Sequence, residues 1–531
     1  MLAAAWLATL AARPLYKTDE ARYGEISREM AQSGDWVTPR LNSIKYFEKP
    51  PLQYWAGAAA FEAFGVHDWA ARIWTGLLAL AGVALAFLAG RRLFGAPAGA
   101  SAAAILAGSP LFIAFGQFNT LDMGVSVFLA AAVFAFAIGQ SPGNETARRR
   151  WMLAGWAACA LAVLSKGLIG IVLPVAAVGL YMLIRRDWTL LRRLELARGM
   201  PLFLAIAAPW FVVVSLRNPE FARFFFVQEH FQRFTTTIHH REHPAWYFVP
   251  ILLAGMLPFV FVVLPAWLAW LRRPAPGFSP PFFLALWAAL VFLFFSASGS
   301  KLPGYILPMF PALAVLAGAY LARAVRQRVL AAQSVLLALC GLALAIAAPY
   351  LSRAGAEQLD RLAGAYAAVL IFAGLALLAG GALAAVLAVR GRIFACVAAL
   401  ALGTLIASLA AIAGHRDYAP LFSASSTIAA MNPQPSAATP FFAVESYDHS
   451  VPWSLRRAVT MVGYRDEFGD AVYWEPGKYI REHAGFTSAW TEARDAYALF
   501  AVRDFDRLRA ELGVPMEVVA RGPRYVIVRK P

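Results

Sequence analysis

The sequence predicts an all-α polytopic membrane domain followed by a soluble α/β domain. Of the 531 residues, 60% are hydrophobic and only 15% are charged, whereas soluble domains carry about 25% charged residues. Apolar runs of about 20 residues, the length that crosses a bilayer as a helix, recur up to residue 413. Beyond them, charged residues are interspersed throughout. We therefore expect a membrane domain over residues 1–413 and a second domain over residues 414–531.

About thirteen membrane spans are expected in the first domain. Their predicted ranges are 1–12, 73–90, 96–116, 123–140, 151–164, 168–184, 201–216, 248–270, 281–298, 304–322, 329–350, 364–388 and 393–413. The first range holds only about twelve apolar residues, fewer than the roughly 20 that a span needs. We expect the native first helix to begin upstream, after a short basic segment.

Arginine clusters predict how these spans are oriented. Every second connection carries one, for example residues 91–92, 148–150 and 390–392. Because loops rich in Arg and Lys stay in the cytoplasm, the first long loop, residues 13–72, and the C-terminal domain, residues 414–531, are expected on the outer face. The same clusters account for much of the net charge of +16. We therefore expect no binding to nucleic acid.

The C-terminal domain is predicted to be α/β because strand-like runs alternate with helical stretches. The strand-like runs are Pro440–Val444, Tyr497–Val502, Met516–Ala520 and Tyr525–Val528, and the helical stretches are Trp490–Ala496 and Asp504–Leu512.

An acidic motif follows the first span directly. Thr18 is expected to cap a helix, which would place Asp19 and Glu20 in the first turn, where the helix dipole favours ionised carboxylates. Arg22 and Tyr23, three and four positions further on, would project from the same face. Two interpretations fit this pattern: a solvated ion pair on a helix surface, or a carboxylate, a guanidinium and a phenol that converge at the outer interface.

Two further features favour a functional site. Residues 46–52 form a second charged cluster, and residues 52–69 are expected to form an amphipathic helix that lies in the interface. Asp122 is a lone acid at the outer end of the third span, and acids at membrane depth are costly and usually functional. We expect an outer cavity bounded by Asp19, Arg22, Glu48, Lys49 and Asp122.

These motifs resemble a known family. The Asp-Glu-x-Arg-Tyr motif at residues 19–23, the Lys-Pro-Pro-Leu segment at residues 49–52, the second acid and about thirteen spans resemble the protein O-mannosyltransferase superfamily, whose membrane glycosyltransferases have the GT-C fold. Within it, the Glu-Lys-Pro-Pro-Leu-x-Tyr-Trp string at residues 48–55 and the outer soluble tail most resemble the bacterial lipid A 4-amino-4-deoxy-L-arabinose transferases. The resemblance covers the whole chain.

The resemblance implies an activity and its partners. The expected reaction transfers 4-amino-4-deoxy-L-arabinose from undecaprenyl phosphate to a phosphate of lipid A, which gives resistance to polymyxin and other cationic peptides. The expected location is the bacterial inner membrane, where a multi-pass monomer surrounded by membrane lipids would turn its active site to the periplasm.

Three other functions are alternatives to this reaction. A related enzyme would pass a polyprenyl-phosphate-linked sugar to a protein or another glycan. A transporter or lipid flippase would use Asp19, Arg22 and Asp122 as ion-coupling residues, but its charges are expected near the bilayer midplane and it often shows internal repeats. Here the acids are at span ends and no repeat is visible. An envelope scaffold would leave the paired loop charges unexplained.

The expected roles follow from the chemistry of a sugar-phosphate donor. Stabilising the leaving phosphate calls for cations at the head-group level. Lys49 and Arg22, with Tyr23 beside them, are the first candidates, and Lys301 and Tyr305 are the next pair. Lys301 could equally be an interfacial anchor.

The two acids, Asp19 and Asp122, are the catalytic candidates. A protein hydroxyl acceptor would need Asp19 as a general base. A lipid A phosphate is already an anion, so with that acceptor Asp19 is expected to bind the sugar's ammonium group or to support positive charge at the anomeric carbon.

The outer loop over residues 218–247 is rich in histidine. Its spacing matches no established zinc template, and no cofactor is required by the motifs. One interpretation is a divalent-metal site, such as zinc, formed by Glu48, His239, His240 and His243. The other is a polar rim that binds phosphorylated lipid through Arg233 and Arg241. Lys166, at a tight outer turn, is expected either to anchor a hairpin or to touch anionic lipid.

Overall fold

The structure is a computed structural model that describes residues 2–141, 143–226, 243–272, 277–323, 327–351 and 357–531. The chain divides into two compact units. The helical unit comprises residues 1–9, 48–52 and 75–414, and the mixed unit comprises residues 10–47, 53–74 and 415–531. The first long loop therefore clusters with the C-terminal residues, although it lies within the first of the two predicted domains.

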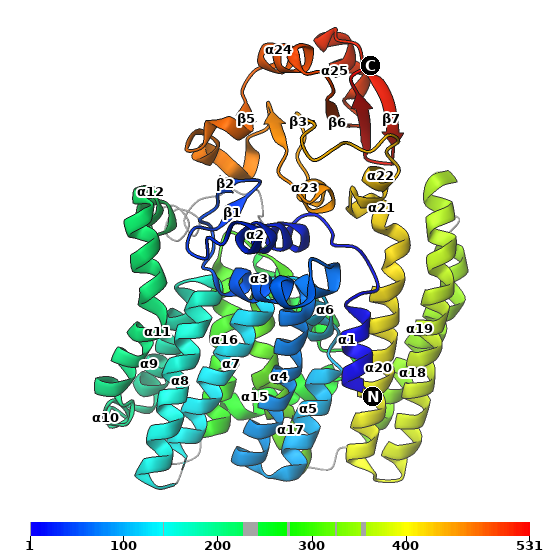
Figure 1. The fold of residues 1–531 in the computed structure, drawn as a ribbon. Helices are drawn as coiled ribbons and strands as arrows, with labels where there is room; N and C mark the ends of the chain where they lie inside the picture. The colour runs from blue at the N-terminus through cyan, green and yellow to red at the C-terminus, as the bar shows by residue number, and fades with distance from the viewer. Residues whose placement is uncertain (1, 142, 227–242, 273–276, 324–326, 352–356) are drawn as a thin grey trace. The chain divides into compact units, whose positions relative to one another are not determined.

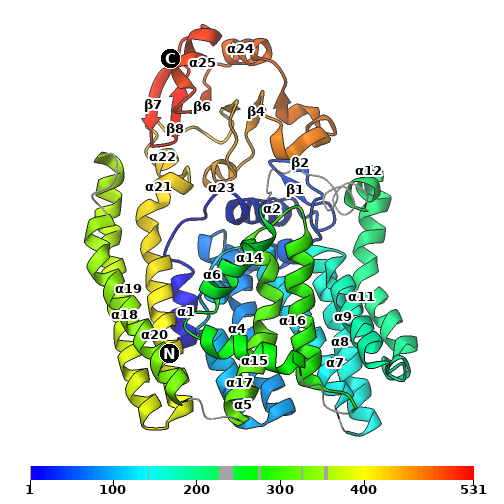
Figure 2. The same cartoon turned by 180° about the vertical axis from the view of Figure 1, so that it is seen from behind.

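Long helices make up the helical unit (Figures 1 and 2). In chain order they are α1 (Leu2–Thr9), α4 (Asp68–Phe94), α5 (Ala96–Ala107), α6 (Pro110–Gln117), α7 (Leu121–Gln140), α8 (Glu145–Lys166), α9 (Ile169–Arg185), α10 (Leu190–Arg193), α11 (Leu196–Arg217) and α12 (Pro219–Ala222). They continue with η2 (Ala245–Tyr247), α14 (Phe248–Gly255), α15 (Val260–Arg272), α16 (Pro280–Ala297), η3 (Pro303–Met309), α17 (Phe310–Arg323), α18 (Gln327–Leu351), α19 (Glu357–Val389) and α20 (Ile393–Gly414).

These helices form a multi-pass membrane protein. Within the described residues, 8 helical segments are long and apolar enough to cross a bilayer, and the pair α5 and α6, bent by 63°, would be a ninth. The other predicted spans fall on α1, α8, α9 and the short pair α14 and α15, which do not meet this criterion. The predicted fold class is confirmed, while the count of about thirteen spans stays a prediction.

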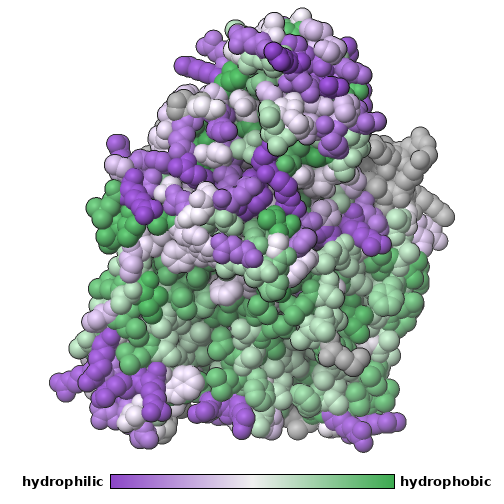
Figure 3. Space-filling view, viewed as in Figure 1, coloured by the Kyte–Doolittle hydropathy of each residue, from purple (hydrophilic) through white to green (hydrophobic). Residues whose placement is uncertain are grey.

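The surface and the packing of the helical unit suit a lipid environment. Large apolar side chains face outward, among them Leu216 at 79% and Val389 at 75% exposure, and the surface over these helices is mostly hydrophobic in Figure 3. Between helices, small residues allow close contact. A Cβ on Gly341 of α18 would lie 2.5 Å from the carbonyl oxygen of Gly374 on α19, so these two helices can approach closely only with glycine there.

The mixed unit contains a six-stranded sheet with the order β5-β4-β3-β6-β8-β7. Its strands are β3 (Phe441–Val444), β4 (Thr460–Val462), β5 (Tyr479–Ile480), β6 (Tyr497–Ala501), β7 (Glu517–Arg521) and β8 (Tyr525–Arg529). The first four in the sheet order are parallel, and β8 and β7 complete it as antiparallel strands.

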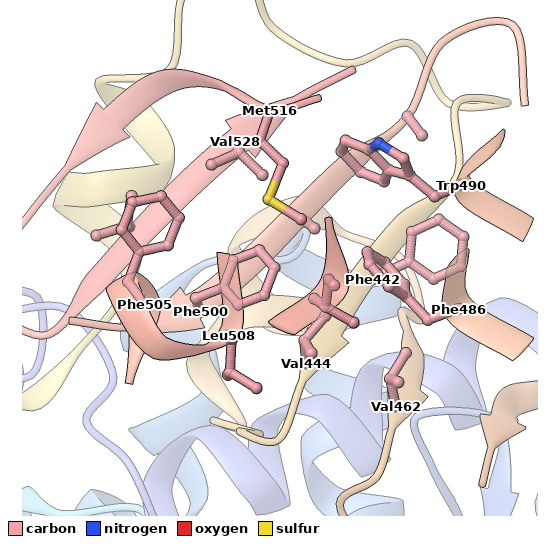
Figure 4. Packing of buried hydrophobic residues seen from close by; sticks show 14 residues of the cluster. Phe442, Val444, Val462, Phe486, Trp490, Phe500, Phe505, Leu508, Met516 and Val528 are labelled. Atoms are coloured by element: carbon pink, nitrogen blue, oxygen red, sulfur yellow. The ribbon is translucent and has the colours of Figure 1, made fainter. Parts of the chain in front are cut away.

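Short helices precede β3 or lie between the strands of this sheet. They are η4 (His415–Tyr418), α21 (Ala419–Phe422), α22 (Ser425–Ala429), α23 (Ser450–Leu455), η5 (Asp466–Tyr473), η6 (Pro476–Lys478), α24 (His483–Glu492) and α25 (Phe505–Leu512). Phe442, Phe486, Trp490 and Phe500 are among the fully or nearly buried side chains that form the core over this sheet (Figure 4). The four predicted strands are present, whereas the short strands β4 and β5 were not predicted.

The predicted bounds of the helix over residues 490–496 are wrong. The helix is α24, which ends at Glu492, and residues 493–496 form a non-helical connection to β6. The reason is packing: Phe486 and Trp490 lie four positions apart on one face and are both fully buried. The apolar residues beyond them belong to the sheet.

The first loop folds into α2 (Asp19–Ser33), the hairpin β1 (Arg40–Leu41) and β2 (Ile44–Lys45), and α3 (Leu52–Phe64). The amphipathic helix predicted over residues 52–69 is interrupted at Gly65, which has φ +81° and donates its N–H to the Phe61 carbonyl. This left-handed conformation favours glycine and ends a helix. A new helix, α4, starts at Asp68.

Candidate active site

A cavity of about 160 Å³ lies within the helical unit. Four charged side chains line it: Glu48, Lys49, Asp122 and Lys166. Its apolar and aromatic walls come from Val125, Ile169, Phe294, Phe295, Tyr305 and Pro308. Two acids and two ammonium groups therefore meet a lipid-like wall.

Asp122 and Lys166 form an ion pair across a helical hairpin. Asp122 is in the first turn of α7 and Lys166 is the last residue of α8. Their side chains are only 12% and 15% exposed, and the Lys166 ammonium lies 4.9 Å from the centre of the Tyr305 ring. A Cβ on Gly304 would lie 2.7 Å from the carboxyl carbon of Asp122, so the η3 backbone approaches this carboxylate closely. The predicted hairpin lysine thus holds a cavity acid.

Glu48 and Lys49 occupy the other charged part of the lining. The Lys49 ammonium donates to the Glu48 carbonyl at 2.9 Å, and it lies 3.9 Å from the Glu48 carboxylate. Both side chains are 14% exposed. The arrangement keeps a cation at the cavity while lowering the cost of its partial burial.

The predicted residues Lys301 and Tyr305 differ in their position relative to the cavity. Tyr305 lines the cavity and packs its ring 5.1 Å from that of Phe295. Lys301 is buried beside it and donates to the Ser298 carbonyl, where Ser298 itself lines the cavity. Lys301 is not among the residues that line the cavity, and its role as a phosphate-binding residue or an interfacial anchor stays a prediction.

The acidic motif lies in the mixed unit, on α2. The Arg22 Nη1 atom is 3.5 Å from the Asp19 carboxylate, and the Asp19 side chain is 40% exposed. The Arg22 Nε–H donates to Nε2 of His449 at 3.2 Å. Tyr23 is buried, with its ring 6.0 Å from that of Tyr54. The helix begins at Asp19 with Thr18 at the N-cap position, as expected, although the Thr18 side chain makes no capping hydrogen bond.

Sequence reasoning placed Glu20 in the first turn of this helix but did not predict its partners. Its carboxylate forms ion pairs with Arg13 and Arg72, and the Arg72 Nε atom lies 2.7 Å away. Burial alone would raise the pKa of Glu20, but the two guanidinium groups outweigh burial and lower the pKa to about 2. Arg72 also donates to the carbonyls of Leu10 and Pro14. The only sequence signal was an arginine at the start of an apolar helix.

The five residues predicted to bound one cavity fall into two groups. Glu48, Lys49 and Asp122 share the cavity of the helical unit, and Asp19 and Arg22 belong to α2 in the mixed unit.

The metal and rim predictions fall mostly outside the described residues. Arg233, His239, His240 and Arg241 are among the residues not described. His243 is described, and its ring stacks on Tyr247 at 4.1 Å. In the part of the chain that the structure describes, no three His, Cys, Asp or Glu side chains gather as metal ligands. A metal site with Glu48 stays a prediction.

Comparisons with known proteins place the chain in a family. Residues 48–212 match the family model for dolichyl-phosphate-mannose-protein mannosyltransferases, and residues 427–530 match the aminoarabinose transferase C-terminal domain. The crystal structure of ArnT from Cupriavidus metallidurans bound to undecaprenyl phosphate is 37% identical, with a TM-score of 0.93 over 100% of this chain and 96% of that one.

Curated relatives agree with this match. The undecaprenyl phosphate-alpha-4-amino-4-deoxy-L-arabinose arabinosyl transferase of Edwardsiella ictaluri is 34% identical over 60% of this chain and 57% of its own length. The enzyme of the same name from Aeromonas hydrophila is 37% identical over 59% of this chain and 57% of its own length. The matched stretches thus span less than two thirds of these relatives.

The helical membrane unit, the charged cavity and the α/β unit together define a GT-C-type membrane protein. The chain belongs to the aminoarabinose transferase family, as the similarity to ArnT over 96% of that chain shows. The resemblance predicted from the sequence motifs is confirmed.

Proposed function

We propose that this chain transfers 4-amino-4-deoxy-L-arabinose from undecaprenyl phosphate to a phosphate of lipid A at the periplasmic face of the bacterial inner membrane. The observation that carries the proposal is the cavity in which Lys49 and Lys166 meet Glu48 and Asp122 against apolar walls. Such a lining suits a donor that has an anionic phosphate, a cationic aminosugar and a polyprenyl chain. The similarity to ArnT bound to undecaprenyl phosphate and to the named arabinosyl transferases supports the same donor.

The reaction exchanges one phosphate for another at the anomeric carbon. An oxygen of the lipid A phosphate attacks that carbon, the bond to the undecaprenyl phosphate oxygen breaks, and undecaprenyl phosphate leaves with the bonding electrons. Because the acceptor is already an anion, the step needs no general base. Negative charge grows on the leaving phosphate while positive charge grows on the sugar ring, so cations and carboxylates in fixed positions lower the barrier.

The chain's residues suit these two tasks. Lys49 has its ammonium at the cavity and would stabilise the leaving phosphate, with Arg22 of the acidic motif in the same role. Asp122, held by Lys166, and Asp19, which is partly exposed on α2, would bind the sugar's ammonium or offset the charge at the anomeric carbon.

Mass spectrometry of a reconstituted reaction tests the proposal. Purified protein in lipid nanodiscs is mixed with undecaprenyl-phosphate-linked aminoarabinose and lipid A. We expect lipid A carrying one added aminoarabinose and an equal amount of undecaprenyl phosphate. Unchanged donor and unchanged lipid A would overturn the proposed function, and donor consumption without modified lipid A would overturn the acceptor.

A further inference from the structure

Within the mixed unit, helix α23 of the C-terminal domain lies along α2, which carries the acidic motif. Three contacts join the two helices. Arg22 donates to His449, and Arg28 donates to the Arg456 carbonyl at 3.1 Å. Gly24 packs against Trp453, since a Cβ added to Gly24 would lie 3.4 Å from the Trp453 ring. All three partners of α2 fall within residues 427–530, which match the C-terminal domain of the family. The motif helix is therefore supported by that domain.

The contact between Arg22 and His449 has a defined chemistry. An arginine side chain has only donors, so the Nε2 atom of His449 must offer its lone pair. In this contact the Nε2 atom of His449 is therefore the acceptor. His449 is 3% exposed and Arg22 is 8% exposed, so little water competes for this bond.

Asp448, the residue before His449, fixes the turn that carries the histidine. One oxygen of Asp448 accepts from the Ser450 N–H at 2.8 Å and from its hydroxyl at 2.6 Å, and the other accepts from Arg524 at 2.7 Å and from Tyr525 at 2.9 Å. The Asp448 side chain is 1% exposed. This carboxylate therefore ties the turn that carries His449 to strand β8.

We propose that His449 is a positioning residue that orients the Arg22 guanidinium for the donor phosphate. With Nε engaged by the imidazole, the plane of the guanidinium is fixed and Nη1 is kept on the Asp19 side. A planar guanidinium recognises phosphate by direction as well as by charge, so its orientation matters for binding. This inference rests on the proposed function, and it gives residues of the C-terminal domain a part in orienting the acidic motif.

Four variants and three measurements test the positioning role. They are His449→Ala, His449→Gln, Arg22→Lys, and His449→Ala combined with Arg22→Lys. Transfer kinetics give KM for the lipid-linked donor and kcat, and tryptophan fluorescence gives the affinity for undecaprenyl phosphate alone. The melting temperature of each variant is measured in the same detergent. His483→Gln, a histidine of the same unit that contacts Glu445 and Glu511, is the matched control.

The expected pattern separates positioning from mere support of the fold. His449→Ala should raise KM and weaken undecaprenyl phosphate binding about tenfold, the loss typical of one hydrogen bond to a charged group. His449→Gln, whose amide oxygen can accept from Arg22, should recover most of that affinity. In the Arg22→Lys background, where Nε is gone, His449→Ala should cost little more. The control should behave as wild type.

Other outcomes overturn the inference. Equal losses in His449→Ala and His449→Gln that follow their melting temperatures would show a structural role only, and additive losses with Arg22→Lys would show that the two residues act independently. If the wild type binds undecaprenyl phosphate but transfers no aminosugar, the proposed function fails and the binding measurements alone decide the role of His449. A wild type that does neither overturns both.

Discussion

Glu20 of the mixed unit and Asp122 of the helical unit are both nearly buried acids that pair with cations, yet their surroundings differ. Glu20 lies between two guanidinium groups, and one of these, Arg72, also donates to several backbone carbonyls. Asp122 has the single ammonium of Lys166 and lines a cavity. A buried ion pair whose donors bind protein atoms stabilises the fold. An ion pair beside a cavity can instead exchange some of its contacts for contacts with a ligand.

Two acids that are adjacent in sequence, Asp19 and Glu20, also differ in their surroundings. Asp19 and Glu20 are adjacent in the motif, but the Asp19 side chain is 40% exposed and the Glu20 side chain only 4% exposed. A motif of acids can therefore contain one residue that holds the loop and another that is available to substrate. Substitutions at these positions should change different measurements.

The largest effect is expected at the Glu20 cluster. Glu20→Gln should destabilise the protein by about 3 to 5 kcal/mol, because the change leaves two buried guanidinium groups without their counter-charge. Thermal unfolding in detergent measures this loss. Glu62→Gln, an exposed glutamate on α3, is the matched control and should melt as wild type. Equal melting temperatures for the two variants would contradict a structural role for Glu20.

Asp122 should show the opposite pattern. Asp122→Asn should lower kcat for aminoarabinose transfer about 100-fold, because a fixed charge at the reacting centre contributes on the order of 3 kcal/mol to the barrier. Its melting temperature should fall less than that of Glu20→Gln. Asp187→Asn, which alters a loop carboxylate bonded only locally to Thr189, controls for the loss of a charge. Turnover close to wild type in Asp122→Asn would remove it from the catalytic residues.

Local patterns were enough to predict much of this molecule. Apolar runs predicted the long helices, and strands such as β6 and β8 follow from runs of apolar and β-branched residues. Asp122 was predicted because an acid is costly at the end of a membrane helix, and Glu48 and Lys49 were predicted because they lie in a charged cluster of the first loop. The place of Lys166 in the cavity lining was not predicted. Each of these signals is contained in a few neighbouring residues.

Contacts between distant residues were not predictable in this way. The partner of Arg22 is His449, 427 positions along the chain, and nothing near either residue signals the other. The same holds for Arg72 and Glu20, and for β4 and β5, which are only three and two residues long. Their pairing depends on neighbours in the sheet, so a single sequence carries little trace of it.

Glu29 extends the comparison along α2 to the pH dependence of stability. Burial and the neighbouring charge of Glu25 raise the pKa of Glu29 to about 8, and its carboxyl accepts the Ser43 N–H at 2.8 Å. The folded state therefore binds a proton that the unfolded chain releases near pH 4.3, so the free energy of unfolding should fall as pH rises from about 4.3 towards 8, by at most about 1.4 kcal/mol per unit. Glu20 has the opposite sign, since its lowered pKa removes stability as pH falls towards 2.

Glu29→Gln should remove this dependence. The variant carries no titratable group at the site, so its melting temperature should change less than that of wild type between pH 5 and pH 8 and should be the higher of the two at the alkaline end. Melting curves across that range, with Glu62→Gln as the control, measure the difference. Parallel curves for Glu29→Gln and wild type would show that the Glu29 carboxyl does not titrate between pH 5 and pH 8 in the folded protein, which would contradict the raised pKa.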